Sequence, residues 1–515
     1  MRSSFMTYFE SLVKKAREKL PEGENADSRL KGEDEGRVLI DSYGDVKIYK
    51  DKSEAFLVYE IPSPHYKGGE RDLINTLVKI AAGVMPPDVA SLSEEEKRRR
   101  YYNKVVEIID KTPELNVPVH AKDFYATAVV REMAGYSLID ALVADDGLEE
   151  IMILGPGKPV YVFHRKYEMM KTNVVFYYDE DIRNLIERIG RAVGRRIDTQ
   201  VPLLDARLPD GTRVNATIPP VSIDGSTITL RKFRKDPFSV VDLLNFNTLD
   251  VSTAAFLWLA TDGLGAYPAN VLIAGGTASG KTTTLNVLCS FVPNNERIVT
   301  IEDTAELSLP LEHWIRMEVR PPSLEGTGEI GMNDLVKNSI RMRPDRIIVG
   351  EIRGEEGYTM FAAMNTGHRG VMGTVHANSA QETLVRLASP PINVPRIMLS
   401  SLNLIIMQNR IHDRRLGTIR RITEIAEVVS TDVDKPEIQV THSWDPVKDK
   451  IFTTGVSSTY EELLKKYTGL NDDGIKAELA ERENILRQLS QSGIRLTSEV
   501  CKITQNYVLR KKLSI

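Results

Sequence analysis

The chain has 515 residues, which is too long for one hydrophobic core, so two or three domains are expected. Hydrophobic residues make up 42% and charged residues 27%, an ordinary composition for a soluble protein. The net charge of 67 − 72 = −5 argues against a broad basic surface, and no stable contact with nucleic acid is expected. Two cysteines, Cys289 and Cys501, exclude a disulfide framework and a tetra-cysteine zinc site.

The start of the chain is predicted to form an amphipathic helix from Phe5 to Leu20, with an apolar stripe opposite a basic face. An acidic, glycine-containing linker is predicted to follow it. The helix either packs on its own domain or contacts anionic lipid or an acidic partner through residues 1–20. The longest apolar run, Met398 to Asn409, is too short to span a membrane, and the start lacks the apolar core of a signal peptide. A cytosolic or membrane-peripheral protein is therefore expected.

The middle of the chain mixes strand and helix signals. Short strands are predicted within 38–62, helices follow, and a mixed α/β segment runs from 139 to 233. The predicted helices span 71–82, 93–110 and 121–133. A charged stretch containing Pro237 then separates two segments that differ in their pattern of strand and helix signals. The domains predicted are an N-terminal helix and linker (1–37), an α/β domain (38–233), an interdomain linker (234–241) and a C-terminal domain (242–515).

In the C-terminal domain, short apolar strands alternate with helical stretches, which is typical of a parallel sheet covered by helices. The predicted strands span 271–274, 298–301, 347–349 and 371–375. A hairpin is predicted around 438–452, and charged helices are predicted from residue 460 onward. The fold class is therefore α/β, with a mixed α/β domain linked to a domain that contains a central, mostly parallel sheet.

The stretch VLIAGGTASGKTTTLNVL places a glycine-rich loop between a strand and a helix, and it fits the pattern G-x-x-x-x-G-K-[ST]. Glycines let backbone N–H groups surround a β-phosphate, and the following helix points its positive end at that phosphate. Lys281 is expected to reach the β- and γ-phosphates, and the Thr282 hydroxyl to ligate Mg²⁺. A chance glycine-rich turn would lack this strand and helix. The predicted ATP-binding residues are Gly275, Gly276, Thr277, Ala278, Ser279, Gly280, Lys281, Thr282 and Thr283.

Two further apolar strands end in carboxylates. DRIIVGEIRG ends in Glu351, which would hold Mg²⁺ partly through water or polarise the attacking water. Gly350 stands where such strands usually carry an Asp. IVTIEDTAEL ends in Glu302 and Asp303. A carboxylate there would orient or deprotonate water, or would cap the next helix, and spacing alone leaves both interpretations open.

Histidines and arginines complete the candidate residues. His368 and His376 flank a strand in TGHRGVMGTVHANS, where structural histidines are the commoner case and no third His or Cys suggests a metal site. Arg207, Arg213 and Arg231 precede the interdomain linker. An arginine from another domain or subunit can neutralise charge on a γ-phosphate, whereas surface salt bridges are the ordinary alternative.

These motifs occur together in one order: RLPDGTR, the glycine-rich loop, TIEDTAEL, RPDRIIVGEIRG and TGHRGVMGTVHA. The order closely resembles that of the secretion ATPase superfamily, which includes type II secretion and type IV pilus motors and the archaellum motor. In family terms the last four are the Walker A motif, the Asp box, an atypical Walker B motif and the His box. The resemblance covers the chain from roughly Gly147 to Ser430.

The resemblance implies a RecA-like C-terminal domain, a homohexameric ring and hydrolysis of ATP with Mg²⁺. Glu302 would be the general base, Glu351 would govern Mg²⁺ and water, and the arginines would act as fingers from the N-terminal side. The residues implied in catalysis are Lys281, Glu302, Glu351, Arg207, Arg213, Arg231, His368 and His376. The implied partners are a polytopic membrane platform protein and accessory cytoplasmic motor proteins, at the inner face of the cytoplasmic membrane.

Two departures resemble the archaeal branch of the family: the chain lacks the tetra-cysteine module, and Gly354 stands where many bacterial members have the Asp of GEIRD. RIHDRRLGTIRRITEIAEV also resembles archaellum and archaeal pilus motors. An archaellum motor is therefore the expected function. The alternatives are an archaeal type IV pilus or type II secretion ATPase, and then a DNA-translocating or filament-retraction motor. A nucleotide-binding scaffold without hydrolysis is disfavoured because Lys281 and Glu351 are both present.

Overall fold

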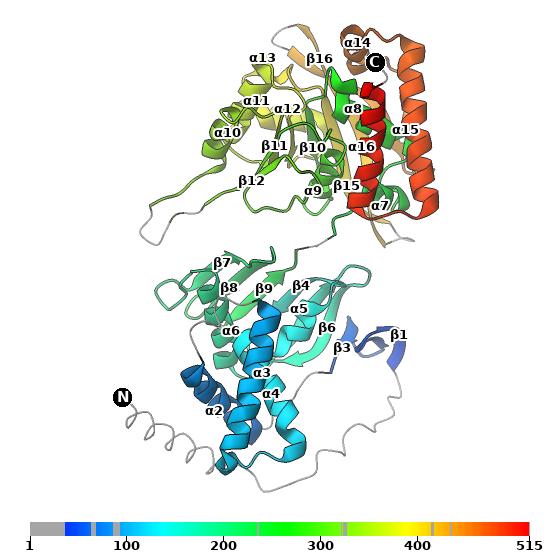
Figure 1. Cartoon of the computed structure of the whole chain (residues 1–515). Coiled ribbons are helices and arrows are strands. Elements are labelled where there is room, and N and C mark those ends of the chain that lie inside the picture. Colours follow the sequence, from blue (N-terminus) through cyan, green and yellow to red (C-terminus); the bar gives the residue numbers. More distant parts are fainter. Residues whose placement is uncertain are drawn as a thin grey trace. The chain divides into compact units, whose positions relative to one another are not determined.

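The computed structural model describes residues 37–62, 68–85, 93–233, 236–320, 322, 327–413, 417–432 and 435–513. The chain folds as two compact units, Met1–Arg234 and Lys235–Ile515 (Figure 1). This division falls at the start of the segment 234–241, which the sequence suggested as a linker. The predicted helix from Phe5 to Leu20 lies outside the described residues. Among the helices in the described ranges, none is both long and apolar enough to cross a membrane.

The first unit contains a nine-stranded sheet in the order β1-β2-β3-β6-β5-β4-β9-β8-β7. Its β3–β6 pair is parallel, and its other pairs are antiparallel. Alternate residues of the central strands are buried, so one face of the sheet packs against a core. The strands are β1 Arg37–Tyr43, β2 Val46–Asp51, β3 Leu57–Glu60, β4 Leu148–Ile153, β5 Pro159–His164, β6 Glu168–Val175, β7 Leu203–Arg207, β8 Arg213–Thr217 and β9 Thr227–Arg231.

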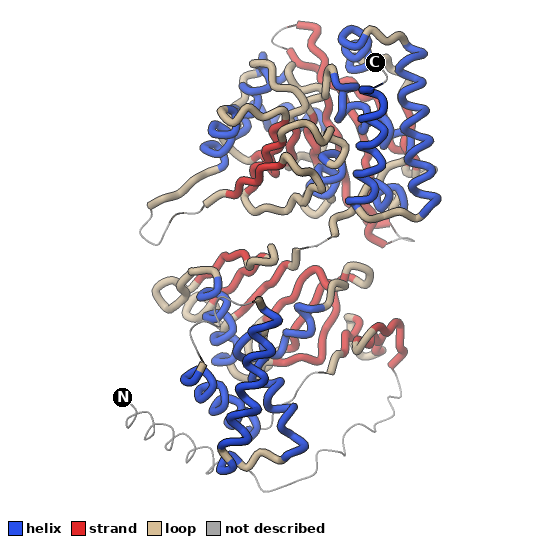
Figure 2. The backbone as a smooth tube through the Cα atoms, in the orientation of Figure 1, coloured by secondary structure: helices blue, strands red, loops and turns tan. Residues whose placement is uncertain are grey.

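Helices of the first unit form two groups (Figure 2). The apolar face of α6 packs on the sheet, whereas α2, α3 and α4 pack on one another in a separate apolar cluster that includes Leu77, Val105 and Val129. Helix α3 begins with a capping box formed by Ser93 and Glu96. The three helices predicted in this part of the chain are confirmed. The helices are α2 Gly68–Val84, α3 Glu94–Lys111, α4 Lys122–Ala134, α5 Asp140–Ala144 and α6 Asp179–Ala192.

The second unit is built on another nine-stranded sheet, in the order β12-β11-β13-β14-β10-β15-β16-β17-β18. The strands from β12 to β15 in this order are parallel. Of these, β10, β11, β13 and β14 were predicted, whereas β12 and β15 were not. From β15 to β18 the pairs are antiparallel, which the sequence reading did not predict except for the last hairpin. The strands are β10 Val271–Ala274, β11 Ile298–Glu302, β12 Trp314–Glu318, β13 Arg346–Ile352, β14 Met372–Val375, β15 Leu404–Asp413, β16 Gly417–Asp432, β17 Lys435–Asp445 and β18 Lys450–Thr453.

Helices cover both faces of this sheet, and every residue of β10 and β11 is buried. One apolar core lies under α8, α9, α15 and α16, and the other lies under α10, α11 and α12 (Figure 1). The predicted fold class, α/β with a mostly parallel sheet in the second domain, is confirmed. The helices are α7 Val240–Asn245, α8 Val251–Asp262, α9 Lys281–Cys289, α10 Met332–Ile340, α11 Glu356–Asn365, α12 Ala380–Ala388, α13 Arg396–Leu399, α14 Thr459–Thr468, α15 Asp472–Ser492 and α16 Thr497–Leu513.

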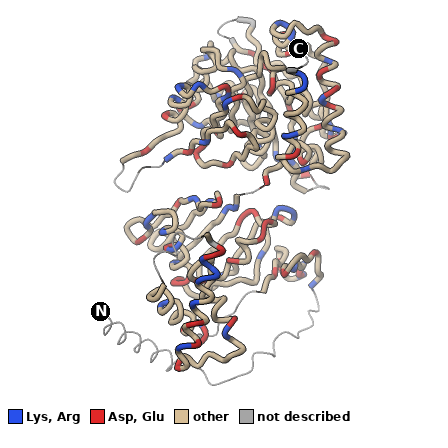
Figure 3. The backbone as a smooth tube through the Cα atoms, viewed as in Figure 1, with Lys and Arg blue, Asp and Glu red and all other residues tan. Residues whose placement is uncertain are grey.

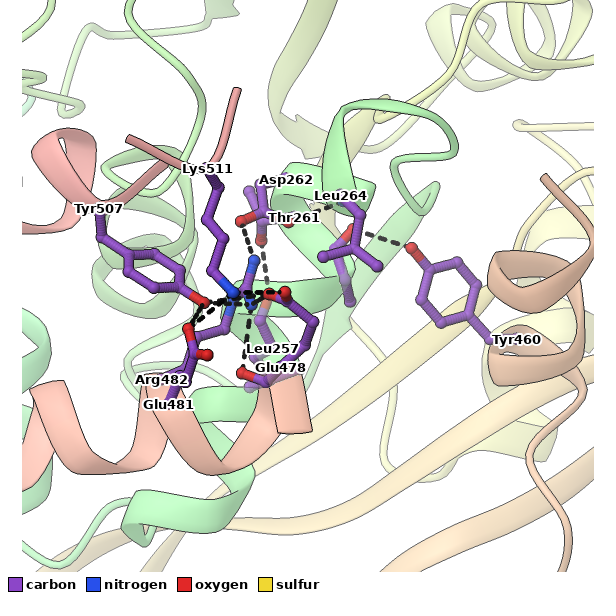
Figure 4. Close-up of polar contacts among 11 residues, drawn as sticks. Leu257, Thr261, Asp262, Leu264, Tyr460, Glu478, Glu481, Arg482, Tyr507 and Lys511 are labelled. Carbon is purple, nitrogen blue, oxygen red and sulfur yellow. Dashed lines mark hydrogen bonds and ion pairs between the residues drawn. The ribbon is translucent and has the colours of Figure 1, made fainter. Parts of the chain in front are cut away.

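A buried arginine fastens the C-terminal helices to this core (Figure 4). Arg482 of α15 is 2% exposed, and it donates hydrogen bonds to Asp262 at 2.8 Å and to Glu478 at 2.5 Å. Its guanidinium lies 5.3 Å from the ring centre of Trp258 and 5.1 Å from that of Tyr507. A charge this deep is tolerated because carboxylates pair with it and aromatic faces surround it.

Basic and acidic residues are interspersed along both units (Figure 3). The run EEEKRRR at the start of α3 is an example. Its acidic residues fall in the first helical turn, where the helix dipole favours negative charge. Arg98 from the same run donates two hydrogen bonds, both of 2.8 Å, to the carboxylate of Asp140. This charge cluster therefore helps to hold α3 against the start of α5.

Candidate functional site

The candidate site lies where parallel strands of the second unit end. Ala274, the last residue of β10, pairs with Val375, the last residue of β14. Val375 also pairs with Ile352, the last residue of β13. Strand β11 runs parallel to β13 on its other side. The glycine-rich loop, Glu302, Glu351 and His376 therefore come to one edge of the sheet, which is where ligands bind in open α/β folds.

The glycine-rich loop joins β10 to α9, and its glycines are required by close neighbours. A Cβ on Gly275 would lie 2.1 Å from the backbone oxygen of Gln408, and one on Gly280 would lie 2.9 Å from the Gln408 amide nitrogen. Gly280 has φ 97°, and Ala278 adopts a left-handed φ of 56°. The helix begins at Lys281 immediately after Gly280. Its first N–H groups have no partner within the helix, so they can bind an anion.

Lys281 folds back over the loop that precedes it. Its Nζ donates to the backbone oxygens of Gly275 at 3.0 Å and Gly276 at 2.8 Å. Burial lowers the pKa of Lys281, whereas the charge of Glu351 raises it and that of Arg353 lowers it. The amine therefore lies within electrostatic reach of the carboxylate on β13. Thr282 and Thr283 follow in the first turn of α9, where both are partly exposed.

Glu351 shares an arginine with Asp303. Arg353 lies 2.5 Å from the Glu351 carboxylate and 3.4 Å from that of Asp303. The hydrogen bond to Glu351 is the main reason that the pKa of Arg353 is raised. This pairing joins the ends of β11 and β13 at the surface of the site. A carboxylate in this position can bind a hydrated cation once Arg353 turns away.

Glu302 occupies a deeper position than Glu351, because it is only 2% exposed. Its Oε1 accepts hydrogen bonds from the backbone N–H groups of Glu306 at 2.9 Å and Leu307 at 3.0 Å. Burial raises the pKa of Glu302 to about 7, although these two hydrogen bonds lower it. The side chain thus organises the loop after β11 and also holds a carboxyl group poised to gain or lose a proton near neutral pH.

The two histidines occupy different settings. His376 directly follows β14 and is partly buried at the sheet edge that carries the glycine-rich loop. His368 lies in the turn after α11, where its backbone N–H donates to the oxygen of Ala363 at 3.1 Å and its Nδ1 lies 3.3 Å from the same atom. His376 is therefore placed with the candidate site, whereas the contacts of His368 are those of a helix end.

Several buried polar atoms around the loop lack a hydrogen-bond partner, although they belong to well-packed residues. A buried donor or acceptor without a partner costs roughly 1–3 kcal/mol, so each one needs an explanation. Ser279 belongs to the loop and Gln408 packs against its glycines, so these atoms fit a site that a polar ligand completes. Within the described ranges these atoms include Ser279 Oγ, Thr284 Oγ1, Asn286 Nδ2, Glu302 Oε2 and Gln408 Oε1.

Two residues against the loop were missed by the sequence reading. Gln408 of β15 is 1% exposed and contacts the glycine-rich loop as described above. Arg420 of β16 donates from Nε to the backbone oxygen of Ala278 at 3.0 Å. For Gln408 the local signal was its position directly after the apolar run LIIM, which forms the strand next to β10. Arg420 carried no signal, because its partner is 142 residues away in the chain.

The arginines of the first unit are aligned across three strands. Arg207 of β7 pairs with Arg213 of β8, and Arg213 pairs with Arg231 of β9. Directly paired residues point to the same face of a sheet, so the three side chains form a row. Arg231 is half exposed and lies 3.7 Å from Glu150 and 3.9 Å from Glu149. The row crosses the edge of the sheet formed by β9, β8 and β7, and Arg231 ends the last strand before the interdomain segment.

Comparisons with known proteins point to the same family as the order of the motifs. Residues 132–441 match the family described as type II/IV secretion system protein. An uncharacterized protein of Methanocaldococcus jannaschii is 32% identical over 93% of this chain and 89% of its own. The type IV secretion system protein VirB11 of Bartonella quintana is 31% identical over 47% of this chain and 76% of its own.

A crystal structure of the pilus retraction motor PilT with bound ADP is similar over 71% of this chain and 95% of that one, at 18% identity and a TM-score of 0.41. The family match covers more than half of the 515 residues, from the end of α4 to within β17. The M. jannaschii relative extends the similarity to most of the chain. The chain therefore belongs to the type II/IV secretion system protein family.

Proposed function

We propose that this protein is an Mg²⁺-dependent ATPase that hydrolyses the γ-phosphate bond of ATP by attack of water. The observation that most supports this is the glycine-rich loop at the start of α9, with Lys281 half-buried inside it and two carboxylates on the neighbouring strand ends. The loop residues 275–283 would bind the phosphates through backbone N–H groups. Among the described residues, the Ser279 hydroxyl and Glu302 Oε2 have no hydrogen-bond partner, which fits a site that a charged ligand and its water complete.

Each side chain has a separate task in this proposal. Lys281 neutralises the β- and γ-phosphate oxygens, and Thr282 together with Glu351 holds Mg²⁺, partly through water. When bound, the ion supplies positive charge to the phosphate oxygens. Glu302 accepts the proton of the attacking water, a role that suits a carboxylate whose pKa is about 7. His376 directly follows β14 at the same sheet edge, and we assign it a supporting contact on the γ-phosphate side. His368 precedes β14 at the other end of that strand and keeps its contacts with the end of α11.

The row formed by Arg207, Arg213 and Arg231 is proposed to act on nucleotide held by the second unit of the same or a neighbouring chain. An arginine supplied in this way stabilises charge that develops as the γ-phosphate leaves. Such an arrangement makes hydrolysis depend on assembly, which suits a homohexameric ring. Arg231 must leave Glu149 and Glu150 to take part, and its exposed position allows this.

We further propose that hydrolysis drives filament assembly or rotation at the inner face of the cytoplasmic membrane, as in an archaellum motor. A polytopic platform protein and accessory cytoplasmic proteins would be its partners, and residues 1–20 would offer a contact with anionic lipid. An archaeal type IV pilus or type II secretion motor is the alternative within the same family. Neighbouring genes that encode archaellum subunits would favour the first role, and pilus or secretion genes the second.

Steady-state phosphate release and nucleotide binding test the enzymatic proposal. Lys281→Ala should abolish hydrolysis and weaken ATP binding, because it removes the positive charge on the phosphates. Glu351→Gln should keep ATP bound but slow turnover by about 10²-fold or more, since the amide keeps the shape and loses the charge. Exposed Glu312, changed to Gln, is the matched control and should behave as the wild type. Binding without turnover in the wild-type protein would leave a nucleotide-dependent scaffold in place of an enzyme.

A further inference from the structure

The strand pair β15–β16 lies against the glycine-rich loop on the side away from the two catalytic carboxylates. Strand β10 is flanked by β14 on one side and by β15 on the other. The β15–β16 ladder is irregular at this point, because Met407 pairs with Glu424 while Gln408 pairs with Ile422. Thr423 is therefore an extra residue, and its hydroxyl accepts a hydrogen bond of 2.9 Å from Asn409. Such bulges change the direction of side chains next to functional sites.

Past the bulge, Arg420 reaches the loop. Its Nε donates to the backbone oxygen of Ala278 at 3.0 Å. A trans peptide group is planar, so its carbonyl oxygen and the next N–H point in opposite directions. Because Arg420 holds the Ala278 oxygen, the Ser279 N–H points the opposite way, into the loop, where it donates a hydrogen bond of 3.4 Å to the oxygen of Gly276. Arg420 thus fixes the orientation of a peptide group in the wall of the proposed phosphate site.

Ala278 itself needs such support. Its φ of 56° lies in the left-handed region, which is unfavourable for a residue that has a Cβ. Strained backbone of this kind persists where surrounding contacts hold it in place. Gln408 adds a second contact from the same strand pair, because its backbone packs on Gly275 and its amide packs on Gly280. The loop is therefore held from outside by β15 and β16.

The next residue anchors the support on its other side. Arg421 is buried, and it donates to both carboxylate oxygens of Asp449 at 2.7 Å and to the backbone oxygen of Phe246 at 3.0 Å. Successive residues of a strand point to opposite faces. Arg420 is thus directed to the loop, while Arg421 fastens the same stretch of β16 to the β17–β18 turn and the end of α7. The stretch of β16 that carries Arg420 is therefore fixed to neighbouring elements by Arg421.

We propose that Arg420 is a positioning residue for nucleotide binding: it braces the glycine-rich loop in its phosphate-binding conformation by holding the left-handed Ala278 peptide. The proposal rests on the ATPase function proposed above. The brace acts before any phosphate arrives, so its loss raises the dissociation constant and KM for ATP. It leaves the carboxylates and lysine that carry out hydrolysis in place, so kcat at saturating ATP changes little.

Titration of the full-length protein with a fluorescent ATP analogue, together with steady-state kinetics, tests this inference. Arg420→Ala should raise the dissociation constant roughly three- to tenfold while kcat changes less than twofold. Arg420→Lys, which keeps a donor and the charge, should recover most of the affinity. Arg487→Ala removes an arginine from the surface of α15 and is the matched control, because that side chain is 58% exposed and pairs with Glu483 one helical turn earlier.

A second background tests whether Arg420 acts through Ala278. Glycine adopts a positive φ without strain, so in Ala278→Gly the loop depends less on the brace. Arg420→Ala should then weaken binding by less than twofold relative to Ala278→Gly alone. Equal losses in the two backgrounds, or unchanged affinity in Arg420→Ala itself, would overturn the proposal. A wild-type protein that fails to bind the analogue would instead overturn the ATPase proposal, and thermal unfolding of each variant checks that it is folded.

Discussion

Replacing Glu302 by glutamine should raise the stability of this protein near neutral pH and lower its activity. The carboxyl group is 2% exposed, and burial raises its pKa from 4.5 to about 7. At about 1.4 kcal/mol for each pH unit, that difference corresponds to about 3 kcal/mol of folding free energy. Because the folded-state pKa is above the unfolded value, Glu302 favours folding in its neutral form. Its contribution is largest below pH 4.5, falls as the pH rises toward 7, and then stays constant.

Glu302→Gln keeps an oxygen that can accept from the N–H groups of Glu306 and Leu307, but it never ionises. The variant should therefore gain stability relative to the wild type between pH 5 and pH 8, by up to about 3 kcal/mol. For a unit of this size that is a rise of roughly 5–10 °C in Tm. Thermal unfolding of both proteins across the pH range measures it, and Glu312→Gln, at an exposed position, should show no such divergence.

The same substitution removes the proposed base, so turnover should fall by about 10²- to 10⁴-fold. In the wild type, phosphate release should rise with pH through about 7, as the carboxyl ionises. Two results would refute the reasoning. Parallel Tm curves for the variant and the wild type would mean that Glu302 does not titrate in this range. A Gln variant with near-normal turnover would mean that another group accepts the proton.

Two other predictions address the arginines of each unit. Arg213→Ala should leave ATP affinity within about threefold of wild type but lower kcat by at least about 10²-fold, because it removes a proposed finger; unchanged phosphate release would exclude Arg213 from that role. Asp262→Asn should destabilise the second unit by about 3–5 kcal/mol, because it leaves the buried Arg482 without its main counter-charge. A Tm equal to that of the wild type would show that Glu478 alone compensates this charge.

The sequence was sufficient for four of the six parallel strands of the second sheet, β10, β11, β13 and β14, because each of these carries a local signal. Apolar runs such as VLIA and IVTIE are buried on both faces, and they stop at glycines or carboxylates. The carboxyl ends of parallel strands meet at one edge, so these stop residues had to come together. The antiparallel strands gave weaker signals. Strand β16 is 16 residues long and mixes charged with apolar residues, so its pairing depends on neighbours that sequence pattern does not identify.

Long-range contacts account for what the sequence could not predict. Arg482 and Glu478 are four residues apart on a helix, which is the spacing of an ordinary surface ion pair. Arg482 is buried because Asp262, 220 residues earlier, and the ring of Trp258 enclose it. Arg420 acquires its contact with Ala278 in the same way, from packing of β16 beside the loop. In both cases the residue type was visible, but its partner was not.

The positions of the two glutamates explain why a glycine precedes Glu351. A Cβ on Gly350 would lie 2.9 Å from the Glu302 side chain, so a larger residue there would displace the buried carboxyl group. The Gly350 backbone oxygen also accepts a hydrogen bond of 2.6 Å from Thr374, which fixes β13 against β14. Glu302 can thus lie deep, with its pKa near 7, while Glu351 stays at the surface beside Arg353.

Two carboxylates in such different environments are suited to different tasks, one exchanging a proton and the other holding charge. Glu302 is buried and accepts from two backbone N–H groups, and its pKa of about 7 suits a group that exchanges a proton near neutral pH. Glu351 is paired with a positive side chain that can be exchanged for a cation. The glycine at position 350, where an acid is usual, therefore allows the two glutamates to take these different roles. The space that an Asp side chain would fill there is occupied by Glu302.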